Sequence, residues 1–219
     1  MYKICDLFDL THTLAKEYLQ KFEYPFLALP NVKNFILELG ATLDKEEYEE
    51  VSPSVWVHKS ASVAKTAHIG APCIIGKNTE VRHCAFIRGS ALVGENCVVG
   101  NSVELKNVIL FDNVQVPHYN YVGDSILGYK SHMGAGSITS NVKSDKTLVT
   151  IKHGDEKMET GLKKVGAFLG DFVEVGCNSV LNPGTVIGRN SNIYPLSSVR
   201  GVVEENSIFK SGDVTVKKS

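Results

Sequence analysis

An aliphatic residue returns every six positions through much of this chain, and that spacing limits the folds available to it. One uninterrupted run comprises Val57, Val63, Ile69, Ile75, Val81, Ile87, Val93, Val99 and Leu105. A second comprises Leu169, Val175, Leu181, Ile187, Ile193 and Val199. A period of six matches neither the 3.6-residue repeat of a helix nor the alternation of an isolated strand. It fits a chain that turns a corner every six residues, so that three hexapeptides form one 18-residue coil of a triangular parallel β-helix.

Residues beside each aliphatic position follow the same repeat. A small or β-branched residue stands two positions earlier, at Ala61, Ala67, Cys73, Thr79, Ala85, Ala91, Cys97 and Val103. Glycine often follows, at Gly70, Gly76, Gly94 and Gly100. We expect the aliphatic side chain to fill the prism, the small one to point inward at the corner, and glycine to supply positive φ there. Coils stack about 4.8 Å apart, so residues 18 apart lie one above the other.

Composition and charge exclude several classes of partner. The 219 residues carry a net charge of −1 and no polybasic run, so we expect neither a nucleic-acid nor a membrane-surface partner. The N-terminus is acidic and lacks an apolar segment, and no run reaches the length of a membrane span, which indicates a cytoplasmic protein without a signal peptide. We interpret Cys73, Cys97 and Cys177 as buried free thiols in a reducing compartment.

The chain divides into an N-terminal part and the solenoid. Residues 1–50 lack the six-residue period and are predicted to be a helical segment and linker, with one helix around residues 10–22 and a second around residues 32–39. The β-helix is expected over residues 51–219. After Leu105 the inward position slips by one, to Leu110, Val116 and Val122. A charged insertion at about 142–164 has the pattern of a hairpin, which is either a tolerated surface loop or an arm toward a neighbouring subunit.

Two cations mark a candidate site on one face. Arg88 and Lys106 are 18 residues apart, so an unbroken register stacks them in adjacent coils. Stacked like charges repel unless an anion lies between them, and arginine and lysine suit a phosphate; a solvated face is the other reading. The column continues through Gly123 or Asp124 to Asn141, and Glu104 and Tyr121 also become neighbours.

His118 lies in the irregular coil beside this column. Imidazole accepts a proton near neutral pH, so His118 is the candidate general base, although a lone histidine is more often structural. A metal site formed by His83, His118 and His132 is the competing interpretation, and the spacing of these residues does not favour it.

Three motifs carry a family resemblance. They are Gly100-Asn-Ser-Val-Glu-Leu-Lys-Asn, Pro117-His-Tyr-Asn-Tyr-Val-Gly-Asp and Met133-Gly-Ala-Gly-Ser-Ile-Thr-Ser-Asn. The stretch from Arg88 to Asn141 resembles, without a gap, the acetyltransferase half of bacterial N-acetylglucosamine-1-phosphate uridyltransferase/glucosamine-1-phosphate acetyltransferase and of related sugar-1-phosphate nucleotidyltransferases. The resemblance extends loosely to about Asn206. It implies a left-handed parallel β-helix of hexapeptide repeats.

The resemblance also implies an activity: transfer of acetyl from acetyl-CoA to the amino group of a hexosamine 1-phosphate. It assigns residues to roles as follows: His118 as general base, Arg88 and Lys106 as sugar-phosphate cations, Glu104, Tyr121 and Asn141 at the sugar, and Ala135 and Cys177 along the acetyl-CoA cleft. No metal is implied for the transfer. Residues 1–50 are too few for the family's uridyltransferase domain, so we expect no pyrophosphorylase activity.

Departures from the family pattern keep a second function open. His132, Val142 and Cys177 replace an asparagine, a tyrosine and a serine of the family. A catalytically silent trimer that binds a sugar nucleotide is therefore the alternative to an amino sugar acetyltransferase. In either case a three-sided prism favours a homotrimer.

Overall fold

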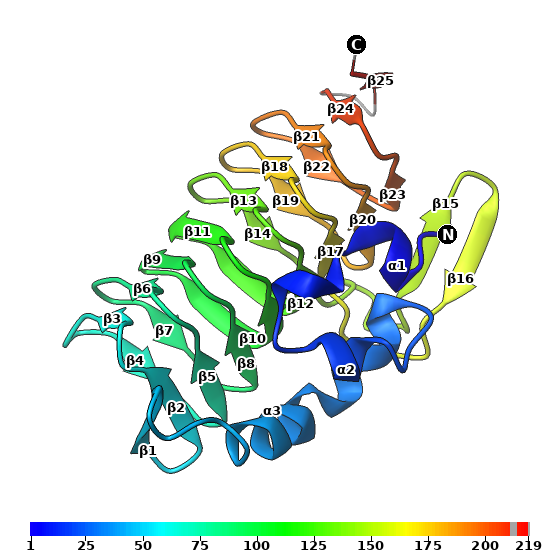
Figure 1. The fold of residues 1–219 in the computed structure, drawn as a ribbon. Helices are drawn as coiled ribbons and strands as arrows, with labels where there is room; N and C mark the ends of the chain where they lie inside the picture. Colours follow the sequence, from blue (N-terminus) through cyan, green and yellow to red (C-terminus); the bar gives the residue numbers. More distant parts are fainter. Residues whose placement is uncertain (211–213, 219) are drawn as a thin grey trace.

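The computed structural model describes residues 1–210 and 214–218, and most of them form a stack of coils (Figure 1). Each turn of the chain crosses three flat faces, which we call A, B and C in chain order. Face A contains β2 (Val55–His58), β5 (Cys73–Ile75), β8 (Ala91–Val93), β17 (Ala167–Leu169), β20 (Thr185–Ile187) and β23 (Val202–Val203). Face B contains β3 (Ser62–Val63), β6 (Glu80–Val81), β9 (Val98–Asn101), β11 (Gln115–His118), β13 (His132–Met133), β18 (Glu174–Val175), β21 (Asn192–Ile193), β24 (Ser207–Phe209) and the antiparallel β25 (Thr215–Lys217). Face C contains β4 (His68–Ile69), β7 (Phe86–Ile87), β14 (Ile138–Thr139), β19 (Val180–Leu181) and β22 (Ser198–Val199).

Two long strands turn the corner from face C to face A. They are β10 (Glu104–Leu110) and β12 (Tyr121–Leu127), and each pairs with face C strands at its start and face A strands at its end. Most coils have 18 residues, as in the pairing of Val57 with Ile75, whereas Val93 pairs with Leu110 only 17 residues later. The predicted one-residue slip is therefore confirmed, and its cause is a shorter corner at Lys106 and Asn107.

The repeat fills the interior from Ile75 onward as predicted, whereas Val63 in the first coil is exposed and Ile69 is only partly buried. Its glycines have another role than expected. Positive φ occurs mainly at non-glycine corner residues such as Asn78 and Asn96, and Gly76, Gly94 and Gly100 are not among the left-handed positions. A Cβ on Gly100 would lie 1.6 Å from the carbonyl oxygen of Pro117 in the next coil. These glycines are required because neighbouring coils approach too closely for a side chain.

The N-terminal segment runs back along the solenoid in short turns. Its elements are α1 (Ile4–Leu7), the 3₁₀ turn η1 (Leu10–His12), α2 (Lys16–Leu19), the 3₁₀ turn η2 (Pro25–Asn31) and α3 (Val32–Gly40). The single helix predicted around residues 10–22 is wrong, because the carbonyls of Leu7 and His12 accept hydrogen bonds from Asp171 and Asp112 of the coils. The second predicted helix exists as α3. The linker expected near residue 48 is instead β1 (Tyr48–Ser52), antiparallel to β2.

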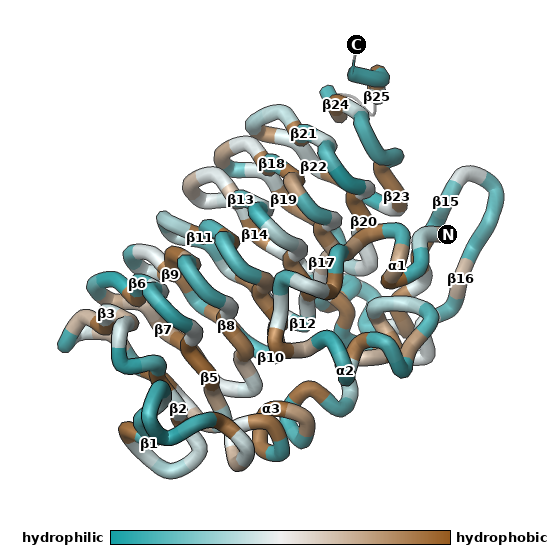
Figure 2. Tube along the Cα trace, viewed as in Figure 1, coloured by the Kyte–Doolittle hydropathy of each residue, from teal (hydrophilic) through white to brown (hydrophobic). Residues whose placement is uncertain are grey.

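This segment covers face A. The outward residues Ile74, Leu92 and Ile109 are fully buried there, which explains the consecutive apolar residues in face A strands. Strands β5 and β8 and helix α3 all contain strongly apolar stretches (Figure 2). The later coils of face A carry the hairpin formed by β15 (Thr150–His153) and β16 (Glu156–Glu159).

The hairpin packs on the chain's own coils. Val149 and Ile151 are buried, and a Cβ on Gly184 would meet both side chains within 3.2 Å. The residues at the base of the hairpin therefore help to cover face A. Among the described residues, no comparable segment covers face B or face C. Within residues 1–210 and 214–218, no helix has the length and apolar character needed to span a bilayer.

Two of the three predicted buried cysteines are buried. Cys73 and Cys97 lie inside the prism, but Cys177 is exposed. The prediction for Cys177 is wrong because the small inward residue of that hexapeptide is Ser179, two positions before the inward Leu181 and fully buried. Cys177 instead occupies the corner between faces B and C.

Candidate functional site

Two corners border face C and carry the predicted site residues. The C/A corner, where the chain leaves face C for face A, holds Arg88, Lys106, Asp124 and Asn141. The B/C corner, where the chain enters face C, holds His118. Because the face C strands β4, β7, β14, β19 and β22 are only two residues long, both corners border the same narrow strip of coils.

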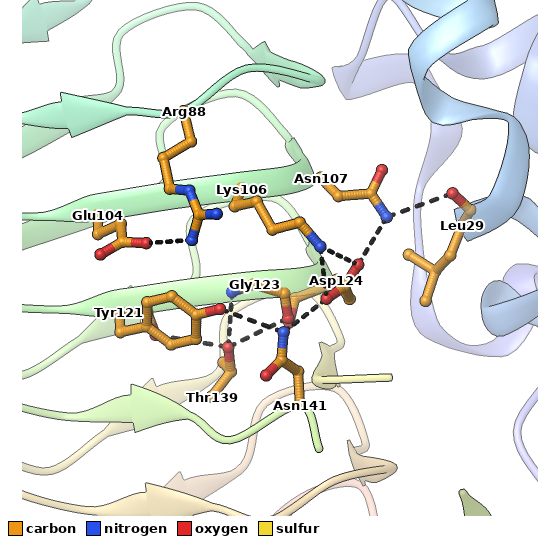
Figure 3. Close-up of polar contacts among 11 residues, drawn as sticks. Leu29, Arg88, Glu104, Lys106, Asn107, Tyr121, Gly123, Asp124, Thr139 and Asn141 are labelled. Carbon is orange, nitrogen blue, oxygen red and sulfur yellow. Dashed lines mark hydrogen bonds and ion pairs between the residues drawn. The ribbon is translucent and has the colours of Figure 1, made fainter. Parts of the chain in front are cut away.

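The two predicted cations lie in adjacent coils at the C/A corner, and each has an acidic partner (Figure 3). Leu105 pairs with Ile87, which places Lys106 opposite Arg88. The guanidinium Nη1 of Arg88 lies 2.9 Å from Oε1 of Glu104, and this bond raises the pKa of Arg88. Lys106 Nζ lies 3.1 Å from Oδ1 of Asp124. Each of the two stacked cations thus has a carboxylate partner within the chain.

Asp124 is the centre of the polar network. Its side chain is 5% exposed, and the residue has a φ of +49° at the corner. Its carboxylate accepts hydrogen bonds from Lys106, from Asn107 Nδ2 at 2.9 Å and from Asn141 Nδ2 at 2.5 Å (Figure 3). Three side-chain donors at this corner are therefore directed at one buried acid.

Tyr121 and Asn141 join the same network. Asn141 Nδ2 also donates to the hydroxyl oxygen of Tyr121 at 3.1 Å, and Tyr121 stacks on Glu104 across β10 and β12. Burial and, to a lesser extent, the charge of Asp124 raise the pKa of Tyr121. Its phenol is therefore a neutral hydrogen-bonding group near neutral pH. The structure thus gathers Arg88, Glu104, Lys106, Tyr121 and Asn141, as the sequence predicted.

The B/C corner forms a second column, separate from this network. The Gly136 amide donates to the carbonyl of His118 at 3.0 Å, so Ala135 lies one coil from His118. The Asn178 amide donates to the carbonyl of Ala135 at 2.9 Å, which places Cys177 in the next coil. The His118 side chain is exposed. The three residues that the resemblance assigns to acetyl transfer therefore form one continuous line along the stack.

An open hollow of about 480 Å³ lies on face B beside this column. Its walls include Cys177, Gly134, Val175, Tyr194 and Pro195. An extended acyl-CoA substrate lying along the stack fits this arrangement, because it would meet Ala135 and Cys177 in successive coils and apolar groups in the hollow.

The three histidines of the competing metal interpretation do not form one cluster. His83 and His118 share the B/C corner but lie two coils apart, with Asn101 between them. His132 pairs with Glu174 at 2.7 Å on face B. No group of three or more potential metal ligands occurs in the described part of the chain.

Residue spacing alone does not show that Asp124, Asn107 and Thr139 belong to the network. It leaves Gly123 and Asp124 as alternatives for the column and does not single out Asn107. Thr139 Oγ1 accepts a hydrogen bond from the amide of Gly123 at 2.9 Å and so fixes the corner beneath Asp124. The available signal is the shortened corner, since the inward residues Leu105 and Leu110 are only five positions apart.

Comparison with known proteins supports the resemblance. No family model matches the chain. The bifunctional sugar-1-phosphate nucleotidylyltransferase/acetyltransferase of Sulfurisphaera tokodaii is 32% identical over 106 residues, covering 48% of this chain and 26% of that protein. The bifunctional protein GlmU of Methanococcus aeolicus is 32% identical over 152 residues, covering 69% of this chain and 32% of its own length. The chain spans about a third or less of these relatives.

A further relative and two solved structures have comparable lengths. An Escherichia coli protein named uncharacterized acetyltransferase YaiX is 26% identical over 200 residues, covering 83% of this chain and 80% of its own. A hexapeptide transferase family protein from Anaplasma phagocytophilum has a TM-score of 0.42 and 16% identity, covering 74% of this chain and 78% of its own. The polysialic-acid-specific acetyltransferase NeuO has a TM-score of 0.45 and 13% identity, covering 72% and 82%. The chain is thus a relative of the bifunctional sugar-1-phosphate nucleotidylyltransferase/acetyltransferases that matches their acetyltransferase part, folded as a parallel β-helix of hexapeptide coils.

Proposed function

We propose that this protein transfers acetyl from acetyl-CoA to the amino group of a hexosamine 1-phosphate. One observation carries the proposal: a cation-rich hydrogen-bonding network and an exposed histidine flank the same narrow face C. The network contains Arg88, Lys106, Tyr121 and Asn141, and the histidine is His118. The relative named bifunctional sugar-1-phosphate nucleotidylyltransferase/acetyltransferase supports this choice of substrate class.

The C/A corner binds the acceptor. Arg88 is half exposed at its side chain, so its remaining N–H groups face solvent and can donate to a phosphate. Lys106 carries three donors, and Asp124 does not use all of them. Tyr121 offers a neutral hydroxyl to a sugar oxygen. Holding the sugar against face C turns its encounter with the thioester into a reaction between neighbours.

The B/C corner performs the proton transfer. The attacking nitrogen must present a lone pair, and it becomes positively charged when it bonds to the thioester carbonyl carbon. His118 accepts the proton from that nitrogen, and the tetrahedral intermediate then expels the coenzyme A thiolate, which takes up a proton. The exposed imidazole leaves room for the substrate amine.

Acetyl-CoA acts as a co-substrate. In this proposal the acyl group lies along the column of Ala135 and Cys177 beside His118, and the hollow on face B receives the chain that carries it; the continuity of the column supports this path. The small side chain at Ala135 leaves room for the thioester next to the base.

A thiol-release assay tests the proposal. The purified protein is incubated with acetyl-CoA and glucosamine 1-phosphate or galactosamine 1-phosphate, and coenzyme A is measured colorimetrically. We expect release with at least one phosphorylated amino sugar, and much less with glucosamine lacking phosphate. N-acetylglucosamine 1-phosphate is the matched control, because its amine is blocked. A folded protein that releases no thiol with any hexosamine phosphate would contradict the proposal.

The compensation of both cations supports a second candidate, a non-catalytic sugar-nucleotide-binding trimer. Arg88 and Lys106 already have carboxylate partners, so the network is complete without a ligand. His132, which replaces a family asparagine, is itself paired with Glu174. Calorimetry separates the two functions: binding of a sugar nucleotide without binding of acetyl-CoA selects the silent trimer.

We also propose a homotrimer. Face A is covered by the chain itself, whereas faces B and C and their common corner are open to a second copy. A three-sided prism can close such contacts around a threefold axis. Light scattering at micromolar concentration is expected to give three times the chain mass of 23.9 kDa.

A further inference from the structure

The carboxylate of Asp124 has a position unlike that of the other acidic groups near the site. Glu104 is partly exposed, whereas the Asp124 side chain is 5% exposed. A buried carboxylate is costly unless donors and a cation compensate it. Three side chains do so: Lys106 at 3.1 and 3.2 Å, Asn107 at 2.9 Å and Asn141 at 2.5 Å.

The donors to Asp124 come from the two neighbouring coils and belong to two groups. Lys106 and Asn141 are the residues proposed to meet the acceptor, and they lie one coil to either side of Asp124. Asn107 forms the second group, because it also donates to the carbonyl of Leu29 in η2 at 3.3 Å (Figure 3). The carboxylate therefore connects the acceptor-facing donors with the segment that covers face A.

We propose that Asp124 is a positioning residue of the acceptor site, which holds Lys106 and Asn141 at fixed places and connects them through Asn107 to the N-terminal segment. This inference rests on the proposed function for its kinetic consequence but not for its geometry. Lysine has a flexible four-carbon side chain and loses rotamer freedom when it binds a ligand. Asp124 removes that freedom before the acceptor arrives.

The geometric part is tested by the reactivity of Lys106. Quantitative labelling with an N-hydroxysuccinimide ester, read by mass spectrometry, reports how free its amine is. We expect Asp124→Asn, which keeps the shape and tolerates positive φ, to increase the Lys106 labelling rate at least about threefold. The matched control is Asp171→Asn. Asp171 is another buried corner aspartate, which pairs with Arg189 and accepts the amide of Asp9, and its replacement should leave Lys106 labelling unchanged.

A second variant covers the case in which Asp124→Asn does not fold. Asn107→Gly suits the φ of +55° at that position, and it removes one donor to the carboxylate together with the contact to Leu29. It should raise Lys106 labelling by a smaller factor. Unchanged labelling in a folded Asp124→Asn protein, or in Asn107→Gly when the former does not fold, overturns the inference.

The kinetic part is tested by a double-mutant cycle with Lys106→Met. Asp124→Asn should raise the KM for the hexosamine phosphate about fivefold or more, with kcat within about twofold. In the Lys106→Met background the same change should alter KM by a clearly smaller factor, because only the contact with Asn141 then remains for Asp124 to position. The inference is contradicted if the KM of the double variant rises by the full product of the two single-variant factors. If the unmodified protein shows no turnover, the proposed function fails, and the labelling ratio still decides the role of Asp124.

Discussion

The guanidinium of Arg88 and the carboxylate of Glu104 form an ion pair of 2.9 Å across one coil step. Arg88 is the cation most accessible to a phosphate, so an incoming anion must share it with Glu104. The two residues therefore have opposite effects on acceptor affinity, although they lie side by side on the same face.

Replacement of Arg88 tests this relationship. Arg88→Ala should raise the KM for the amino sugar phosphate roughly threefold to tenfold and leave kcat nearly unchanged, because it removes an exposed contact made equally before and during reaction. Glu104→Gln should lower the same KM, since it releases the guanidinium. Steady-state kinetics with acetyl-CoA at saturation measures both. A rise in KM for Glu104→Gln would instead identify Glu104 as a sugar ligand.

His118→Ala should affect the chemical step. Loss of a general base typically costs about 10²–10⁴ in rate, so kcat should collapse while acceptor binding by calorimetry changes little. His83→Ala is the control, because His83 occupies the same corner two coils away and is also exposed. If weakened binding accompanies an unchanged kcat, His118 positions the substrate, and Glu104 becomes the next candidate for the base.

Thiol labelling of the cysteines can locate the acetyl-CoA-binding surface. Cys5, Cys84 and Cys177 are exposed and should react with iodoacetamide, whereas Cys73 and Cys97 should not in the folded protein. Burial raises the pKa of both inner thiols, that of Cys97 to about 12, so they lack the reactive thiolate.

Acetyl-CoA should then slow the labelling of Cys177 and leave Cys5 and Cys84 as internal controls. Peptide mass spectrometry at a series of acetyl-CoA concentrations gives the protection of each thiol separately. Equal rates at Cys177 with and without acetyl-CoA would place the co-substrate elsewhere.

The hairpin and the N-terminus should respond to acid through Glu204. Its carboxylate lies 2.6 Å from Nε2 of His153 and accepts a hydrogen bond from Tyr2 at 2.7 Å, and the His153 contact is the main cause that lowers the pKa of Glu204 below its usual 4.5. A lowered carboxyl pKa stabilises the folded state above the unfolded pKa, and this stabilisation is lost as pH falls through the lowered value.

Glu204→Gln should therefore lower Tm by about 2 °C at pH 6, a small effect because the carboxylate is half exposed. The Tm difference between the two proteins should disappear by about pH 3. Calorimetric scans of both proteins across this range measure it. A difference that persists at pH 3 would show that Glu204 contributes by packing and not by charge.

The repeat and its slip could be predicted because the inward residue of each hexapeptide can be identified from the sequence as its aliphatic residue. The slip at Leu110 was visible for this reason, and it correctly placed Glu104 beside Tyr121. The cover over face A could not be predicted from periodicity, because it depends on which outward residues are buried by a distant segment. The available signal was the consecutive apolar residues in face A strands, such as Ile74 between Cys73 and Ile75.

The site was predicted less completely than the fold. Residue spacing placed Lys106 near Arg88, but it could not show that each cation pairs with a carboxylate. The direction of a side chain at a shortened corner depends on the local φ, which the spacing does not give. The left-handed conformation of Asp124 turns its carboxylate under Lys106. The error at Cys177 has another cause, because Ser179, two residues before Leu181, holds the small inward position of that hexapeptide.

The path of the N-terminal segment changes how the whole chain is expected to unfold. Coils of a solenoid usually contact only their neighbours, so stability is a sum of local terms and the ends can fray independently. Here Tyr2 contacts Glu204, more than 200 positions away, and Trp56 in the first coil packs against Gly40 of α3. The N-terminal segment thus joins the first coil to the last ones. We expect it to convert a one-dimensional stack into one cooperative unit, in which loosening either end weakens the other.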